Sequence, residues 1–379
     1  MSVLFWISVS VVVYSYLLYP LLLLALEILQ KQKHFKKEGI TPGVSIVIAA
    51  YNEEKVIKQR IENCLSLDYP KELLEIIIAS DGSDDQTGSI VRQYSSRNVI
   101  LKDYKERRGK VNVLNETVPQ AKHPIIIFSD ANASFHPDAV RNIVRHFADE
   151  HIGAVCGRLY FVNSQDGETG ELEGVYWRYE TLLKKLEGKR GSLMGANGAI
   201  YAIRKELFEA CPSDTIIEDF FIPMKILQRG FAVIYDPRAE AVEETAQKIV
   251  HEKERRIRIG AGDYQALFRL LPMLNPLRGF SALAFWSHKV LRWLSPFFLI
   301  TALVSNLFLL DEKVYFILFI LQGGFYLSAL FGQALAWSGM SIKVFNLCYY
   351  FVSMNLALLL GFFRFLLGTQ KAAWHRTQR

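Results

Sequence analysis

The stretch IIIFSDANASF, residues 125–135, places four apolar residues shortly before an acid and an amide. Ile125–Phe128 have the composition of a buried strand, and Asp130 and Asn132 stand where that strand should end. Asp and Asn are common in turns because their side chains hydrogen-bond to the nearby backbone. Their oxygens are also suitable ligands for a divalent cation. The stretch therefore predicts a strand that ends either in a plain turn or in a cation site.

Earlier segments repeat this plan. Apolar runs at 44–49 and 74–79 are followed by the polar turns 51–53 and 81–85, and each turn leads into a helical pattern. NVILKDY (98–104) predicts a third short strand, and RRGKVNVLNETV (107–118) begins a further helix. Strands that alternate with helices indicate a right-handed α/β sheet. Because ligands of such sheets bind outside the carboxyl ends of strands, we expect the polar turns to converge on one crevice.

Several function classes lack their sequence signals. AAYNEE follows the first strand where a dinucleotide-binding protein would have GxGxxG, and GxxxxGK[ST] is absent, which argues against a dehydrogenase and a P-loop ATPase. Carboxylates near Lys and Arg still suggest a nucleotide phosphate held through a divalent ion. The cysteines are scattered without a CxxC pair, which argues against zinc and a disulfide framework. They are Cys64, Cys156, Cys211 and Cys348.

Apolar segments at both ends predict membrane spans. Residues 1–30 are long and apolar enough to cross a hydrocarbon core of about 30 Å. The basic linker 31–42, with KQKHFKK at 31–37, puts the N-terminus outside and the following residues in the cytoplasm. Residues 286–368 predict about three spans, near 286–310, 314–336 and 345–367. Four crossings would leave the basic tail 369–379 outside, whereas its charges favour the cytoplasm. Either the last span is interfacial or re-entrant, or the tail is an exception to the positive-inside rule. A cytoplasmic tail is favoured.

Residues 262–285 lead from the globular part to the spans. GDYQALFRLLPML (262–274) has helical amphipathic spacing and predicts a helix lying in the membrane interface, with Tyr264, Phe268 and Trp286 as anchors. Much of the net charge of +6 lies beside the apolar segments. These basic residues predict contacts with anionic lipids, not with nucleic acid.

Seven segments together resemble the membrane-bound family 2 glycosyltransferases, the group that includes cellulose, hyaluronan and poly-N-acetylglucosamine synthases. They stand in the family's order and cover nearly all of 43–265. The segments are VSIVIAAYNEE (44–54), IIIASDGSDDQT (76–87), RRGKVNVLN (107–115), IIFSDANASF (126–135), GANGAIYAIRK (195–205), IEDFFIPMKILQRGFAVIYDPRAEAVEE (217–244) and KERRIRIGAG (253–262). The resemblance implies an α/β domain of the GT-A (nucleotide-diphospho-sugar transferase) fold at 43–261, flanked by transmembrane helices.

The resemblance also implies how a nucleotide-sugar donor binds. Asp130 matches the first acid of the family's DxD motif and would help hold Mg²⁺ or Mn²⁺ against the diphosphate. Asn132 replaces the second Asp, which implies weaker metal binding or a water-mediated contact. Arg256 takes the arginine position of Q-x-x-R-W, although Lys253 and Ile257 replace Gln and Trp. The implied nucleotide contacts are Ala50, Tyr51, Glu53, Asp81, Lys110, Asp130 and Arg256.

The segment IED (217–219) matches the family's catalytic acid motif. Asp219 would be the general base that takes the proton from the acceptor hydroxyl. Acids also favour the start of a helix because of its dipole, so a plain structural role for Glu218 and Asp219 stays open. The implied contacts with the donor or acceptor sugar are Gly195, Asn197, Gly198 and Glu218. GANGAIYAIRK would otherwise be an ordinary Gly-rich turn before a strand, and Arg255 and Arg258 would otherwise face lipid headgroups.

The resemblance implies an inverting hexosyl- or N-acetylhexosaminyltransferase in the plasma (inner) membrane, with its catalytic domain in the cytoplasm. It would move a sugar from a nucleotide donor, UDP-sugar above others, to a saccharide or lipid-linked acceptor in polysaccharide or glycolipid biosynthesis. A processive synthase that exports its polymer stays open, with an oligomer or an export partner completing the channel. A silent nucleotide-binding regulatory protein also stays open, because Asn132 lacks a charge. A transporter would need polar groups buried in its spans, and the sequence shows few.

Overall fold

The computed structural model describes residues 1–29, 35–162, 169–244, 249–338, 340 and 342–371. These residues divide into two compact units. The sheet unit comprises residues 31–164, 184–247 and 371–379, and the helical unit comprises residues 1–30, 165–183 and 248–370. The helix α7 (Thr169–Gly188) contributes to both units.

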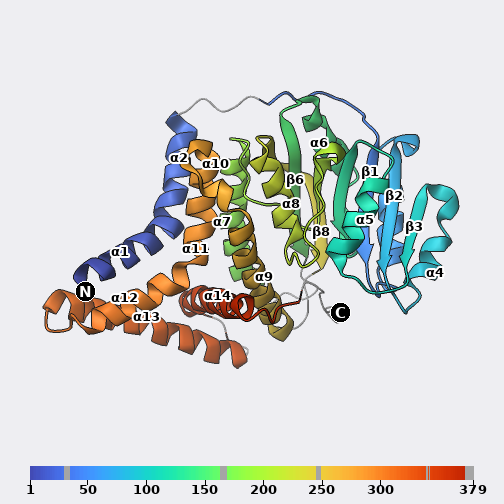
Figure 1. Ribbon diagram of the computed structural model, residues 1–379. Coiled ribbons are helices and arrows are strands. Elements are labelled where there is room, and N and C mark those ends of the chain that lie inside the picture. Colours follow the sequence, from blue (N-terminus) through green and yellow to red (C-terminus); the bar gives the residue numbers. More distant parts are fainter. Residues whose placement is uncertain (30–34, 163–168, 245–248, 339, 341, 372–379) are drawn as a thin grey trace. The chain divides into compact units, whose positions relative to one another are not determined.

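The sheet unit is built on one mixed sheet, which in the described residues has eight strands in the order β3-β2-β1-β4-β7-β6-β8-β5. The strands β1 (Val44–Ala50), β2 (Leu74–Asp81), β3 (Val99–Tyr104) and β4 (Ile125–Asp130) are parallel, as the alternating pattern predicts. They lie side by side in Figure 1. Every residue of β1 and β2 is buried, because helices cover both faces of this half of the sheet and leave no polar face on these strands.

The other half of the sheet departs from the parallel pattern. Strand β7 (Tyr201–Arg204) is antiparallel to both β4 and β6 (Ile152–Val162), and β6 is parallel to β8 (Ala232–Glu244). The short strand β5 (Ala133–Phe135) pairs with the C-terminal end of β8. The repeated strand-and-helix pattern stops after β4, because the chain turns back within a few residues of Asp130 to form β5.

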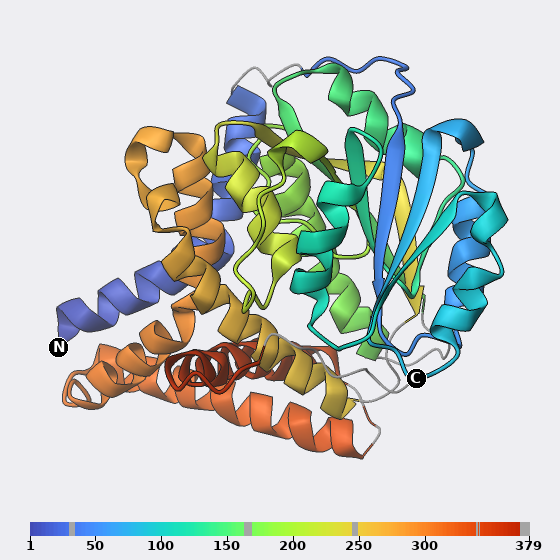
Figure 2. The same cartoon turned by 45° about the vertical axis from the view of Figure 1, so that its right-hand side comes forward.

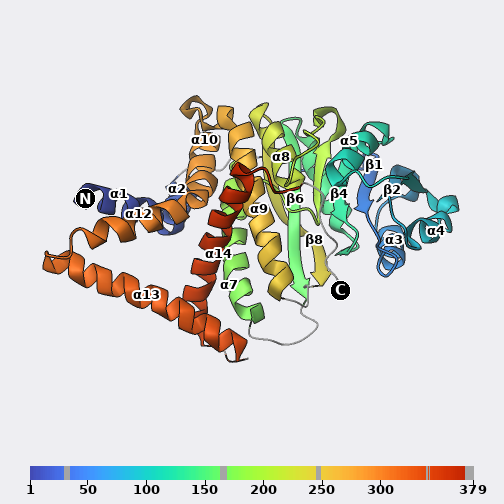
Figure 3. The same cartoon turned by 60° about the horizontal axis from the view of Figure 1, so that its bottom comes forward.

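Helices cover both faces of the parallel strands. Figure 3 shows α5 (Lys110–Gln120) on one side of β1 and β2, and α3 (Ile57–Leu65) and α4 (Thr87–Arg92) on the other. The helices α6 (Ala139–Val144) and α8 (Glu218–Gln228) pack on the second half of the sheet. Helix α3 does not follow the predicted turn 51–53 directly but starts at Ile57, because the backbone N–H groups of Glu53 and Glu54 donate to side chains of the next turn.

The helical unit contains three helices that are long and apolar enough to cross a membrane, in the part of the chain that the structure describes. They are Ser2–Leu29, Lys313–Ala336 and Lys343–Leu366. The first comprises α1 (Ser2–Val13), a π-helical segment (Tyr14–Leu18) and α2 (Tyr19–Leu29); the others correspond to α13 (Lys313–Trp337) and α14 (Lys343–Leu366). Figure 2 shows α13 and α14 as the orange and red helices.

The span predicted near 286–310 is a bent helix pair. The helices Phe280–Trp293 and Ser295–Leu307 (α12) meet at an angle of 57°, and together they would make a fourth span. The first of them comprises α10 (Phe280–Ala284), a π-helical segment (Phe285–Val290) and α11 (Leu291–Trp293). Pro296 explains the break, because proline has no N–H to continue the helix and its ring collides with the preceding turn.

Helix α9 (Ile249–Arg269) crosses the boundary predicted between residues 261 and 262 and belongs to the helical unit. Tyr264 is buried, and its hydroxyl donates to the Trp293 carbonyl. Its predicted role as an interfacial anchor is therefore wrong. Phe268 and Trp286 are exposed, with 56% and 39% of their surface accessible, and their role as anchors stays a prediction.

Candidate active site

The carboxyl ends of β1 and β2 bring two polar turns together, as the sequence predicts. The Asn52 N–H donates to Ser83 Oγ at 3.1 Å, and the Glu53 N–H donates to Thr87 Oγ1 at 2.8 Å. Asn52 has a positive φ of 55°, a conformation that Asn tolerates better than most residues. Ala50 is the last residue of β1 and is buried.

Asp81 is buried at the end of β2 and orders the loop that precedes α5. Its Oδ1 accepts from the Arg108 N–H at 2.6 Å, and its Oδ2 accepts from the Gly109 N–H at 2.9 Å. Gly109 has a φ of 88°, which suits glycine alone among common residues. Asp81 therefore fixes the backbone directly before Lys110. Its predicted contact with a uracil or ribose stays a prediction.

Lys110 joins three elements of the sheet unit at one point. It is the first residue of α5, and its Nζ lies 2.8 Å from Asp130 Oδ1 and 2.7 Å from Glu218 Oε1. Burial lowers the pKa of Lys110, but Asp130, Glu218 and Asp219 outweigh it and raise the pKa well above its usual value. The Lys110 ammonium therefore stays charged at the carboxyl-end edge of the sheet, beside the carboxylates of Asp130 and Glu218.

Asp130 and Asp219 face the same small space above Gly198. A Cβ on Gly198 would lie 3.0 Å from Asp130 Oδ2 and 3.5 Å from Asp219 Oδ2. The Ala196 N–H donates to the Asp219 carbonyl at 3.0 Å, which fixes the glycine-rich turn to the first turn of α8. The turn also needs Gly195, whose φ is +84° and whose Cβ would lie 2.3 Å from the Phe220 ring. The glycines therefore leave the space into which both acids project.

Asn197 and Tyr51 make contacts within the sheet unit. The Asn197 side chain donates to the Gly157 carbonyl at 3.0 Å and accepts from the Ile200 N–H at 3.1 Å. It thereby holds the turn against β6. The Arg107 guanidinium lies 3.9 Å from the centre of the Tyr51 ring, so the turn after β1 and the loop before α5 are stacked. The predicted sugar contact of Asn197 and the nucleoside contact of Tyr51 stay predictions.

Arg256 lies in the helical unit, on α9, whereas the other predicted site residues lie in the sheet unit. Its guanidinium lies 4.8 Å from the centre of the Tyr350 ring and donates to Met354 Sδ, both on α14. Its predicted contact with a diphosphate stays a prediction.

Two residues beneath the site were not predicted from the sequence. Arg60 is buried on α3, donates to Ser129 Oγ at 2.9 Å and stacks on the Phe135 ring at 4.2 Å. Ser129 precedes Asp130 and also donates to the Ala199 carbonyl at 2.9 Å, so this network joins the end of β4, which carries Asp130, to the glycine-rich turn. An arginine between Ile57 and Ile61 on the apolar face of a helix is the signal that could have revealed it. The second residue, Tyr201, is buried at the start of β7.

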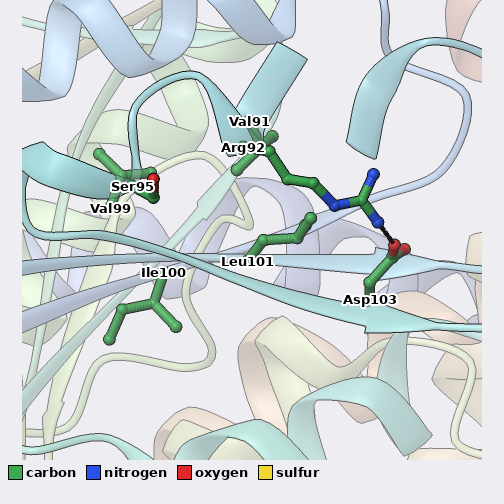
Figure 4. A pocket seen from close by; sticks show the side chains of 7 residues that line it. All are labelled: Val91, Arg92, Ser95, Val99, Ile100, Leu101 and Asp103. Carbon is green, nitrogen blue, oxygen red and sulfur yellow. Dashed lines mark hydrogen bonds and ion pairs between the residues drawn. The ribbon is translucent and has the colours of Figure 1, made fainter. Parts of the chain in front are cut away.

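A shallow pocket lies elsewhere, beside the edge strand β3 (Figure 4). It is lined by Val91, Arg92, Ser95, Val99, Ile100, Leu101 and Asp103. Its charged groups, Arg92 and Asp103, form an ion pair with each other across the pocket wall. None of the carboxylates above Gly198 lines it, so the chemistry of the site lies apart from this pocket.

A comparison with protein-family models shows which family part of this chain is similar to. Residues 45–211 match the model "Glycosyl transferase family 2". These residues, here called the family 2 domain, are similar to family 2 glycosyltransferases. The matched segment contains Asp81, Lys110, Asp130 and Gly198, and it ends before Asp219.

Curated relatives extend the match beyond the family 2 domain model. A poly-β-1,6-N-acetyl-D-glucosamine synthase of Staphylococcus aureus (strain COL) is 27% identical over 235 residues, which cover 60% of this chain and 56% of the relative. The synthase of Staphylococcus epidermidis is 27% identical over 248 residues, covering 64% of this chain and 58% of the relative. The chain thus spans little more than half the length of these relatives.

The fold is shared with a solved structure. A mannosyltransferase from Pyrobaculum calidifontis, solved in complex with GDP-Man and Mn²⁺, superposes with a TM-score of 0.73 at 22% identity. The superposition covers 96% of this chain and 99% of that chain. The mixed α/β sheet, and the apolar helices that precede and follow it in the sequence, confirm the predicted GT-A architecture.

The Asp130 carboxylate beside Gly198 suits a cation whose other ligands come mainly from the substrate and from water. Among the described residues, no three His, Cys, Asp or Glu side chains gather as a metal cage. Mg²⁺ is commonly bound by one or two protein carboxylates together with substrate phosphates. The Asp130 side chain is 36% exposed at the strand end, and Gly198 has no Cβ that would crowd its Oδ2. Asp130 therefore fits such a cation, and the predicted metal contact of Asn132 stays a prediction.

Proposed function

We propose that the chain is an inverting glycosyltransferase that uses a nucleotide-sugar donor. The observation that supports this most is the pair of carboxylates, Asp130 and Asp219, which face one space beside the ammonium of Lys110. A base and a stabilised leaving group are the two requirements of a single displacement at a sugar carbon. The family 2 domain and the glycosyltransferase relatives support the same activity.

In the proposed reaction, Asp219 accepts the proton of the acceptor hydroxyl. The freed electron pair of that oxygen forms a bond to the anomeric carbon of the donor sugar. The bond from this carbon to the phosphate oxygen breaks, and its electron pair leaves with the nucleoside diphosphate. A positioned base of this kind contributes roughly 10²–10⁴-fold to the rate. Because one displacement occurs on the face opposite the leaving group, the anomeric configuration inverts.

Lys110 and Asp130 would serve the leaving group. The Lys110 ammonium supplies positive charge to the diphosphate, and its pairing with Asp130 sets its position. Asp130 and Asn132 would hold Mg²⁺ or Mn²⁺, which when bound supplies charge stabilisation to the leaving diphosphate. Asn132 contributes no charge, so we expect an ion held mainly by Asp130 and the substrate.

We propose a UDP-sugar as donor and a saccharide or lipid-linked molecule as acceptor. Similarity to the poly-N-acetylglucosamine synthases supports an N-acetylhexosamine, whereas the structure that shares the fold was solved with GDP-Man. The apolar helices support a membrane location, which we propose to be the plasma membrane. The basic segment after the first helix supports a cytoplasmic catalytic unit.

Nucleotide release by the detergent-purified chain tests this function. UDP-GlcNAc, UDP-glucose and GDP-mannose are each supplied with Mn²⁺, with Mg²⁺ and with a chelator. We expect release from one donor that depends on the metal and increases when membrane lipid extract is added as acceptor. Binding of UDP or GDP without release, even with lipid extract, would replace the proposal with a silent nucleotide-binding protein, the alternative that Asn132 favours.

The size of the radiolabelled product separates two versions of the proposed enzyme. A polymer would identify a processive synthase, and a product carrying one added sugar would identify a single-transfer enzyme. Ile257, in the position of the family's Trp, favours single transfer, because it offers no aromatic platform for a growing chain.

A further inference from the structure

The hydroxyl of Tyr201 is buried without a hydrogen-bond partner among the described residues. Tyr201 is 1% exposed, and its ring stacks on Phe128 with 4.6 Å between the ring centres. Burying a hydroxyl without a partner costs free energy of folding, so such groups are rare in folded proteins and call for an explanation. The stacking explains the ring but not the hydroxyl, since phenylalanine would stack equally well.

The sheet places this hydroxyl on the face of the acidic site. Tyr201 pairs with Phe128 across β7 and β4, and Asp130 lies two residues further along β4. Because side chains alternate along a strand, Phe128 and Asp130 share a face. Burial, followed by the charges of Glu218 and Asp219, raises the pKa of Tyr201 well above its usual value. The hydroxyl therefore keeps its proton and can donate a hydrogen bond on the face of the sheet that carries Asp130.

Glu218 is the acid that would need such a donor. It is 8% exposed, and in this structure Lys110 neutralises it at 2.7 Å. Lys110 also forms an ion pair with Asp130. A nucleoside diphosphate bound near Asp130 would compete with Glu218 for the Lys110 ammonium. A buried carboxylate that loses its cation is strongly destabilised unless another donor takes over.

We propose that Tyr201 is a positioning residue, to which the Glu218 carboxylate turns when the donor diphosphate draws Lys110 away. Glu218 is the first residue of α8, and Asp219 follows it directly. A hydrogen bond from Tyr201 to Glu218 would keep the start of α8 in place while the base acts. The inference rests on the proposed function, because it requires a bound nucleotide.

The variant Tyr201→Phe removes the hydroxyl and keeps the ring that stacks on Phe128. The probe is UDP with Mn²⁺, or GDP with Mn²⁺ where the wild type binds GDP more tightly, and the readouts are the Kd and the Tm of the free protein. We expect the Kd to rise about 10- to 100-fold, the range for a hydrogen bond to a charged group. We expect the Tm of the free protein to stay the same or rise, because an unsatisfied group is removed.

Tyr94→Phe is the matched control. The Tyr94 hydroxyl is bonded to Glu62 at 3.0 Å, away from the acidic site. This variant should lower the Tm slightly and leave the Kd unchanged. If Tyr201→Phe lowers the free-protein Tm in the same way and leaves the Kd unchanged, its hydroxyl has an ordinary structural partner and the inference is wrong.

A double variant tests whether Tyr201 acts through Glu218. In the Glu218→Gln background the side chain carries no charge to be stabilised, so adding Tyr201→Phe should change the Kd less than about twofold. A full additive loss would overturn the inference. Failure of the wild type to bind either nucleotide would remove the proposed function together with this inference. If the wild type binds a nucleotide and Tyr201→Phe binds it with the same Kd, the inference about Tyr201 is wrong and the proposed function stands.

Discussion

Gly198 lies directly against the Asp130 carboxylate, since a Cβ at Gly198 would stand 3.0 Å from Asp130 Oδ2. The same Cβ would stand 3.5 Å from Asp219 Oδ2. One glycine thus separates the acid that would hold the leaving group from the acid that would take the proton. The spacing makes this turn the most sensitive backbone position of the site.

Gly198→Ala should lower transfer without unfolding the protein. The added methyl group must push Asp130, and displacements of about 1 Å in an active site can cost roughly 100-fold in rate. We expect a loss of at least about tenfold in kcat and a small change in Tm. Gly39→Ala is the control, because a Cβ there meets nothing within 4 Å. Equal rates for the two alanine variants would contradict the arrangement of acids around Gly198.

Asp81→Asn should destabilise the sheet unit. Both oxygens of the buried carboxylate accept backbone N–H groups, and an Asn can present only one oxygen to them. We expect the free energy of unfolding to fall by about 1–3 kcal/mol, as for a buried donor left unsatisfied. Chemical denaturation followed by circular dichroism measures it. Asp103→Asn, which breaks an exposed pair with Arg92, should cost under about 1 kcal/mol. Equal losses would show that Asp81 does not order the loop.

Asp236 should make the sheet unit sensitive to acid. Burial opposes its ionisation, but hydrogen bonds from His146, the Arg238 backbone and Arg145 hold the pKa of Asp236 well below its usual 3.8. Since the unfolded chain binds the proton more readily, the stabilisation is present above about pH 4 and is lost as the pH falls further. Thermal unfolding from pH 7 to pH 2 should show a steeper acid loss for the wild type than for Asp236→Asn. Parallel curves would refute this assignment.

Glu180 should be essential to the stability of the helical unit. This buried acid lies 2.6 Å from Arg292 and 3.2 Å from His288, in a chain whose apolar segments show few polar residues. Glu180→Gln leaves the buried arginine without its carboxylate, which typically costs about 3–5 kcal/mol. We expect a lower Tm in detergent, and a partial recovery when Arg292→Met is added. A double variant less stable than Glu180→Gln would contradict the pairing.

The first half of the fold and most of the acidic site were predictable. Strands buried on both faces, such as β1 and β2, appear in the sequence as apolar runs that end in polar turns. Because parallel strands end at one edge, the turns that begin at Asp81 and Asp130 were expected to converge. Asp81 orders the loop directly before Lys110, and Lys110 forms an ion pair with Asp130. The helix start at Glu218 was equally visible.

The remaining features depend on partners far apart in the chain. The three-residue strand β5 is stabilised by pairing with β8, about a hundred residues later, and is too short to leave a pattern. The position of Tyr201 beside Phe128 arises from the antiparallel strand β7, and the pairing of Glu218 with Lys110 joins α8 to α5. The bend at Pro296 shows that hydropathy predicts apolar length but not the path of the helix.

Transfer by Asp219→Asn is the most direct test of the account. The variant is compared with the wild type and with Asp68→Asn, which removes an exposed acid paired with Arg141. With the donor that the wild type uses, we expect Asp219→Asn to bind the nucleotide and the metal normally while its rate of transfer falls roughly 10²–10⁴-fold. Asp68→Asn should transfer at the wild-type rate. An Asp219→Asn variant that transfers as fast as Asp68→Asn would contradict the assignment of Asp219 as the base.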